Sequence, residues 1–444
     1  MPTGALSRQA FAIIFCVSLA TAVGNTGMQS VLPAIGRSIG IPDPLVAAIF
    51  SLSAVLWAVV SPFWGRASDR LGRKPMMIVG LGGFAVSMFL CALVVSVGLQ
   101  HWLAPLVVFG LFLLSRSLFG LIGSASNPAT QAYVAERTTP EERTPKMSQL
   151  AGSFGLGTIL GPAIAPLFVL PLIGLAGPMY AFAFAAAAMI YVVARYLPAD
   201  GPGERQHVSR LWTMAREEVA SIKNPAAREK GLWFDPRLFP FLLYGFLIAS
   251  CQGVQGQTLG FVIIDKLGVS PLAAQGYTAV AMMAGAIAGL LAQWGLVMMF
   301  QMRPRDLLRV GVMIAAGANI IAAFAPNYWT VVIGFALANL GYGLSRPGFT
   351  AGSSLSVNMD EQARAAGAIA AVNGSSFIFA PVLSVWMYEH VAPSPFLMNV
   401  GILAWLVFYC YSNNTLKNAG DLPATSREVA ASTLERTDES GPNV

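Results

Sequence analysis

The sequence predicts an all-α integral membrane protein with twelve transmembrane helices in two pseudo-symmetric six-helix bundles. Three observations predict this fold: an apolar composition, twelve long apolar segments, and a basic segment that divides them six and six. Of the 444 residues, 55% are hydrophobic and only 11% are charged, whereas a soluble globular chain has about 25% charged residues. Too few polar groups remain to cover a water-facing surface, so lipid must be the solvent.

The elements follow from segment length, because a spanning helix needs about 20 apolar residues. The twelve segments are approximately 10–35, 44–64, 75–98, 103–133, 146–171, 177–197, 236–262, 271–299, 307–325, 328–355, 363–387 and 394–412. We therefore expect an N-terminal bundle at 1–197, a cytoplasmic linker at 198–235, a C-terminal bundle at 236–412 and a disordered cytoplasmic tail at 413–444. Within the linker, Leu211–Ile222 forms either a short amphipathic helix on the membrane surface or a solvated helix.

The basic residues orient the chain. With both termini in the cytoplasm, nearly all of the 27 Lys and Arg residues lie inside; Arg37 and Lys266 fall outside, and Arg116 and Arg346 fall within spanning segments. Such an asymmetry sets the topology. We expect a multi-pass protein of the inner (plasma) membrane, with the net charge of +6 reflecting topology instead of nucleic-acid binding.

No residue pattern indicates an enzyme. The four cysteines lie in apolar stretches without metal-ligand spacing, and no G-x-x-x-x-G-K-[ST] phosphate loop is present. We expect no cofactor, metal, ATP or nucleic acid, and a monomer in lipid.

A ten-residue charged segment, 65–74, separates the second and third apolar segments. Glycine allows a tight turn, and one carboxylate stands among four cations, so the segment could hold two helix ends together and later release them. The alternative is an inside-facing loop that only follows the positive-inside rule. Its sequence, G-R-A-S-D-R-L-G-R-K, is similar to the G-x-L-A-D-R-x-G-R-K pattern of the major facilitator superfamily, with departures at Ala67 and Ser68. The expected gating residues are Gly65, Asp69, Arg70, Gly72, Arg73 and Lys74.

This resemblance implies alternating access, in which two six-helix bundles rock about a site near the midplane. In that family the matching aspartate, here Asp69, caps a helix end and pairs with Arg73 or a neighbouring helix, which stabilises the outward-facing state.

The fifth segment is rich in small residues, which allow helices to pack closely in lipid. Gly157, Gly161 and Pro162 match the G-x-x-x-G-P-x-x-G-G pattern of the superfamily's drug–proton exporters, but Ala165-Pro166 replaces the final Gly-Gly. We expect these three residues to pack against a neighbouring helix. The resemblance points to the twelve-helix drug–proton antiporter branch, similar to tetracycline and multidrug exporters.

Arg116 lies deep in the fourth segment, where a cation costs at least ~2.5 kcal/mol and needs a partner or a water-filled cavity. Its surroundings resemble the helix-4 arginine motif of the same exporters. It either bonds to neighbouring polar groups or takes part in substrate or proton handling. No acid lies in the middle of a spanning segment. A cavity with an arginine and no carboxylate favours a neutral, zwitterionic or anionic substrate over a lipophilic cation.

Polar residues on the central helices are candidates for the cavity wall, although an amide in a spanning helix also bonds to neighbouring helices. The expected substrate or coupling residues, with Arg116, are Asn25, Gln29, Gln252, Gln255, Gln257, Asn339 and Asn373. For Arg346 we expect a structural role at the inner gate, against Asp360 or Glu361.

The two halves resemble each other. Asn127-Pro128, Glu142, Gly155 and Pro162 align with Arg346-Pro347, Glu361, Gly374 and Pro381 at a constant shift of 219 residues, and Gly40 and Gly268 occupy matching places. Weak self-similarity of two six-helix halves is typical of transporters with a central site.

The leading hypothesis is export of small amphipathic compounds driven by the proton gradient. The second is uptake of an anionic or zwitterionic solute, such as a siderophore or peptide fragment, by symport or facilitated diffusion. A third, a non-transporting receptor or sensor, is disfavoured because the chain carries no appended soluble domain.

Overall fold

The computed structural model describes residues 6–171, 173–198, 235–300, 302–357 and 361–419. The expected linker helix Leu211–Ile222 and most of the expected tail lie outside these residues. Each predicted spanning segment coincides with one helix or one run of consecutive helices. In chain order these are α1 (Arg8–Ile39), α2 (Asp43–Leu71), α3 (Arg73–Leu99), α4 to α5 (Pro105–Leu121, Ser126–Glu136), α6 (Pro140–Ile164), α7 (Gly177–Tyr196), α9 (Phe239–Leu267), α10 to α11 (Pro271–Leu290, Val297–Phe300), α12 (Pro304–Ala323), α13 (Tyr328–Leu355), α14 (Gln362–His390) and α15 (Ser394–Ser412), followed by the short α16 (Asn414–Lys417).

Ten of these segments are long and apolar enough to cross a membrane, when only the described residues are searched. The remaining two are α13, which is long enough but slightly less apolar, and α14, several of whose side chains lie outside the described residues. For α13 the reason is visible in its sequence, because Asn339 and Arg346 lie on a face that does not meet lipid. A spanning helix needs an apolar surface only where it contacts lipid.

Three spanning segments contain a change of helix type. Residues Gly123–Ala125 form a 3₁₀ turn between α4 and α5, and Ala165–Phe168 form another after α6, just beyond Pro162. Leu291–Leu296 form a π-helix between α10 and α11. Such π turns often mark functional positions in helices, and Gln293 of this one lies on the wall of the cavity described below.

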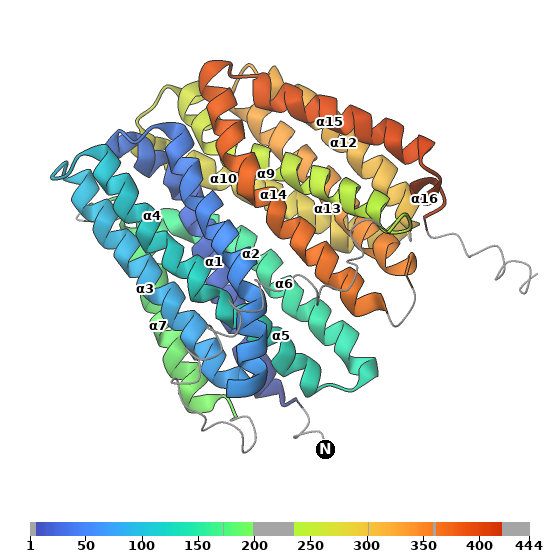
Figure 1. Cartoon of the computed structure of the whole chain (residues 1–444). Coiled ribbons are helices and arrows are strands. Elements are labelled where there is room, and N and C mark those ends of the chain that lie inside the picture. Colours follow the sequence, from blue (N-terminus) through green and yellow to red (C-terminus); the bar gives the residue numbers. More distant parts are fainter. Residues whose placement is uncertain (1–5, 172, 199–234, 301, 358–360, 420–444) are drawn as a thin grey trace, which may run out of the picture.

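The helices form two groups that lie side by side, α1–α7 and α9–α15 (Figure 1). Across the boundary between them, α2 packs against α14, α6 against α10, and α1 against both α9 and α10. We name the two sides after the predicted topology. The outer side carries the helix ends at Gly40 and Gly268, and the inner side carries those at Gly72 and Arg137.

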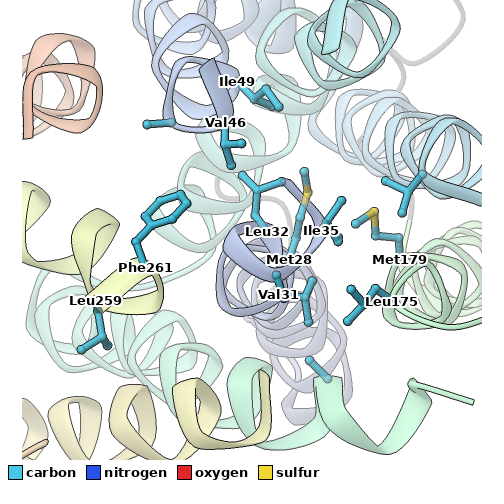
Figure 2. Close-up of a cluster of buried hydrophobic side chains, with 14 of the residues drawn as sticks. Met28, Val31, Leu32, Ile35, Val46, Ile49, Leu175, Met179, Leu259 and Phe261 are labelled. Carbon is cyan, nitrogen blue, oxygen red and sulfur yellow. The ribbon is translucent and has the colours of Figure 1, made fainter. Parts of the chain in front are cut away.

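The apolar core is shared by both groups on the outer side only. One cluster joins Met28, Val31 and Leu32 of α1 to Leu259 and Phe261 of α9. Figure 2 shows the α1 residues at the centre of this cluster, with the α9 residues on one side and Leu175 and Met179 on the other. Toward the inner side, each group instead has its own separate core. Among the described residues, the two halves therefore share an apolar core toward the outer side, and each has a core of its own toward the inner side.

Candidate functional site

A cavity of about 720 Å³ lies between the two groups of helices. Its size is that of a small-molecule site, about 300–1,000 Å³. Its walls are single faces of α1, α6, α10 and α13, with contributions from α2, α5 and α9. On α1 the lining residues run from Gln29 to Val17, which is about 18 Å along the helix axis at 1.5 Å per residue. The cavity thus extends from mid-membrane depth toward the inner side.

The face of α13 shows how the sequence forms this wall. Phe335, Asn339, Tyr342, Gly343 and Arg346 line the cavity, and their spacing of three or four residues puts them on one face of a helix. The Tyr342 hydroxyl points away from the cavity, since the Asn319 amide donates to it at 3.0 Å. Tyr342 therefore presents its ring, not its hydroxyl, to a bound molecule.

Four of the predicted amides lie on the cavity wall: Asn25, Gln29, Gln252 and Asn339. The Gln252 amide donates to Asn339 Oδ1 at 3.4 Å, and Asn339 donates to the Phe335 carbonyl at 2.9 Å. Gln252 Oε1 is buried without a hydrogen-bond partner among the described atoms. Trp57 adds an aromatic face. The wall mixes amides with aromatic rings.

The prediction that three glutamines of one helix line the cavity was wrong for two of them. Gln255 is buried between α9 and helices α12, α13 and α15, and neither of its polar side-chain atoms has a partner among the described residues. Gln257 lies at a small gap against Gln29 and Pro33, toward the outer side. At 3.6 residues per turn, positions 255 and 257 are about 160° apart, so one cavity could not receive both.

Arg116 lies behind the wall, not in it. Its side chain is 1% exposed. It donates a hydrogen bond to Asn25 Oδ1, and its guanidinium carbon lies 4.3 Å from the Phe119 ring centroid and 5.1 Å from that of Phe50. The partner that this deep cation requires is therefore an amide and two aromatic faces. Arg116 Nε and Nη1 have no hydrogen-bond partner among the described residues, and the bond from Nη2 holds Asn25, whose side chain lies on the cavity wall.

Arg346 does not form the predicted ion pair with Glu361. Glu361 Oε1 instead accepts from Arg237, at 3.1 Å, and Arg237 also binds Asp235 at 2.7 Å. The hydrogen bonds that the side chain and backbone N–H of Arg237 donate to Asp235 hold the pKa of Asp235 below its ordinary value. Arg346 is exposed in the cavity wall. The other predicted partner, Asp360, and the side chain of the predicted wall residue Asn373 lie outside the described residues.

The charged segment 65–74 is more helical than predicted. Gly65, Asp69 and Arg70 belong to the last turns of α2, Arg73 and Lys74 begin α3, and Gly72 alone, with φ of 99°, breaks the helix. The apolar residues of a spanning helix end where the lipid ends, but the helix itself can continue into water. The length of the apolar segment therefore underestimates the length of the helix.

Within this segment, Arg73 is the central residue. It forms ion pairs with Asp69 and with Glu136 at the end of α5, and donates to Ser68 Oγ at 3.1 Å. The three partners all belong to the first group of helices.

At the outer side an ion-pair network does cross between the groups. Arg37 of α1 binds Asp43 at 2.8 Å and Asp265 of α9 at 3.1 Å, and the Tyr388 hydroxyl of α14 donates to Asp265 at 2.8 Å. These residues are not among the site residues predicted from the sequence. A signal was present, because Arg37 and Asp265 carry opposite charges and each precedes its matching glycine, Gly40 or Gly268, by three residues.

The small residues of α6 pack directly against α1. A Cβ at Gly161 would lie 2.5 Å from the Val23 carbonyl and 2.7 Å from Gly27 N. Thr26 donates to the carbonyl of Gly157 at 2.8 Å, and Pro162 is buried. Glycine lets the two backbones approach, as in close helix pairs of other membrane proteins.

Comparisons with known proteins agree with this architecture. The family model of the Major Facilitator Superfamily matches residues 14–318. The tetracycline resistance protein, class D, of Salmonella ordonez is 24% identical over 394 residues, covering 86% of this chain and 90% of that protein. Multidrug resistance protein 1 of Bacillus subtilis (strain 168) is 23% identical over 381 residues, covering 84% and 88%.

A solved structure with the same fold is that of the human organic anion transporter MFSD10, with a TM-score of 0.61 over 90% of this chain and 99% of that one, at 18% identity. The fold, the cavity between two groups of helices, and a family match over most of the sequence lead to one assignment: the chain belongs to the major facilitator superfamily of membrane transporters.

Proposed function

We propose that this transporter exports small amphipathic compounds across the inner (plasma) membrane by alternating access, driven by the proton gradient. The observation that carries the proposal is the cavity of about 720 Å³, which extends toward the inner side, while an ion-pair network and a shared apolar core close the outer side. A transporter that loads from the cytoplasm needs this arrangement in one of its states. The tetracycline and multidrug resistance proteins among its relatives support export.

In this proposal the bundles 1–197 and 236–412 move as units about the cavity, with both chain ends in the cytoplasm. The outward-facing state requires the Arg37–Asp265 pair to separate and the inner ends of the helices to meet. We propose that Asp69 and Arg73 then hold the inner side closed, with Gly72 setting the angle between α2 and α3.

The test is transport in proteoliposomes with an imposed pH gradient, scanning compounds by charge. Export coupled to protons predicts uptake into the liposomes against a concentration gradient when their interior is acidic, and collapse of that gradient by a protonophore. If the compound accumulates equally with and without the protonophore, proton coupling is contradicted. The proposal that the protein transports the compound would still stand.

Uptake of an anionic or zwitterionic solute is the second candidate, and the lining of the cavity favours it because its described residues include an arginine and no carboxylate. Cells with and without the gene separate the two directions. Lower susceptibility to a toxic compound supports export, and growth that depends on an external solute supports uptake.

A further inference from the structure

The charge on the cavity wall is of one sign only among the described residues. Among the described residues that line it, Arg346 is the only charged one. Its side chain is exposed in the wall, and none of the ion pairs or side-chain hydrogen bonds of the described chain involves its guanidinium; only its backbone carbonyl accepts, from Thr350. A guanidinium has five donors in a planar fork. Those donors face the space in which a substrate would lie.

The matching position in the other half is neutral. Asn127 aligns with Arg346 at the shift of 219 residues, each is followed by a proline, and both side chains line the same cavity. The internal repeat thus places two polar residues at the inner part of the wall, and only the one on α13 is charged. The other polar lining groups, including Asn25, Gln29 and Gln293, are neutral and both donate and accept hydrogen bonds.

Arg116 adds to the positive potential without competing for a ligand. It is buried behind Asn25, as described above, and no ion pair of the described chain involves it. Since no described lining residue supplies a negative charge, a cation entering the cavity would meet two positive groups. Like charges in a poorly solvated site are strongly unfavourable.

We propose that the substrate carries a negatively charged group, a carboxylate, sulfonate or phosphate, and that Arg346 binds this group while Trp57 and Phe335 contact an apolar portion. The proposal rests on the transport function proposed above and narrows it to organic anions and zwitterions. Arginine suits the role because its fork matches the geometry of these groups and stays protonated at any physiological pH. The neutral amides at the deeper end of the cavity fit hydrogen-bonding groups on the rest of the molecule.

The test uses three probes with one aromatic core and different fixed charge: 2-naphthalenesulfonate, 2-naphthamide and trimethyl(2-naphthyl)ammonium. Binding to purified protein is measured by equilibrium dialysis, and uptake is measured in proteoliposomes. The variants are Arg346→Gln, Arg346→Lys and Arg346→Glu. The matched control is Arg305→Gln, which removes one positive charge near the inner end of α12 without lining the cavity.

Wild type should bind the sulfonate at least about tenfold more tightly than the ammonium probe, as expected for a charge-assisted hydrogen bond. Arg346→Gln should abolish this preference, Arg346→Lys should retain most of it, Arg346→Glu should reverse it, and Arg305→Gln should match wild type. If Arg346 has a purely structural role, Arg346→Gln should instead lower the affinity for all three probes equally.

The failures are distinguishable. Transport of the neutral or ammonium probe without binding of the sulfonate would overturn the anion proposal and leave transport standing. Absence of binding and uptake for all three probes would count against both proposals. An equal loss for all probes in Arg346→Gln would overturn the assignment of the anion site to Arg346.

Discussion

The two sides of the boundary between the helix groups differ in what joins them. At the outer side, the groups share one apolar core, and Arg37, Asp265 and Tyr388 connect α1, α9 and α14. At the inner side, each group has a separate core among the described residues, and Arg73 pairs with Asp69 and Glu136 of the first group. At the outer side, apolar contact and charge pairing thus act at the same boundary, whereas the described apolar cores of the inner side belong to one group each.

This arrangement has an energetic consequence. Burial of apolar surface is stabilising but not directional. It therefore favours contact between the two groups of helices without fixing which residues of one group face which residues of the other. An ion pair at a partly exposed interface contributes little net energy, but like charges in its place would oppose closure. The apolar core therefore supplies most of the closing free energy, and the ion pairs select which surfaces meet.

The largest expected effect comes from the inner side. Asp69→Asn should abolish transport while the protein remains in the membrane, because Asp69 is proposed to hold the inner side closed in the outward-facing state. Its side chain is 62% exposed here and pairs with Arg73, so the inward-open state should lose less than about 1 kcal/mol. Transport activity is measured in membrane vesicles, and the amount of protein in the same membranes is measured by immunoblot.

The control is Glu136→Gln, which removes the other carboxylate partner of Arg73 and should retain transport. Full transport activity of Asp69→Asn would refute the proposal that Asp69 holds the inner side closed. Charge pairing would then distinguish only the outer side.

At the outer side, Asp265→Arg should lower transport by about tenfold, since it places two arginines together where the groups must meet. Asp265 is 44% exposed, so water screens part of the repulsion. Spin labels at Trp102 and Trp329, on exposed outer ends of the two groups, should report a longer mean distance than in wild type. Lys266→Asp, a charge reversal at the neighbouring exposed position, should leave the distance unchanged. Unchanged distances in Asp265→Arg would show that charge does not hold this side.

The smallest effect tests the apolar contact on its own. Gly260→Ala places a methyl group 2.5 Å from Pro33 Cγ across the outer interface, and overpacking of this kind costs about 1–3 kcal/mol. The same label pair should show a several-fold rise in the outer-open population. Gly276→Ala, whose added Cβ meets no atom within 4 Å, provides the control. Equal behaviour of the two variants would mean that helix propensity, not contact with Pro33, explains any change.

Much of the fold was predictable because lipid imposes a simple rule on sequence. Length and apolarity located each segment that the structure shows as a long helix or a run of consecutive helices. Helix ends were less predictable. α2 continues to Leu71 and α9 to Leu267, because backbone hydrogen bonding continues beyond the lipid while the hydropathy signal stops.

The site was predictable only in part, for reasons of geometry. Asn25, Gln29, Gln252 and Asn339 line the cavity as expected, but Gln255 points into its own bundle because its direction on the helix differs. Composition identifies polar residues in membrane helices, but which wall they reach depends on helix rotation. The Arg37–Asp265 pair joins positions 228 apart in the sequence. Arg346 faces the cavity, although Glu361, 15 residues later in the sequence, looked like a natural partner.

One consequence concerns the repeat itself. Arg37 and Asp265 stand three residues before left-handed glycines with φ of 87° and 61° that end α1 and α9. Equivalent positions thus bear complementary charge, which a symmetric ancestor made of identical halves could not have had. Two copies of the first half would confront arginine with arginine. The outer ion pair therefore favours contact between unlike halves over contact between two like halves.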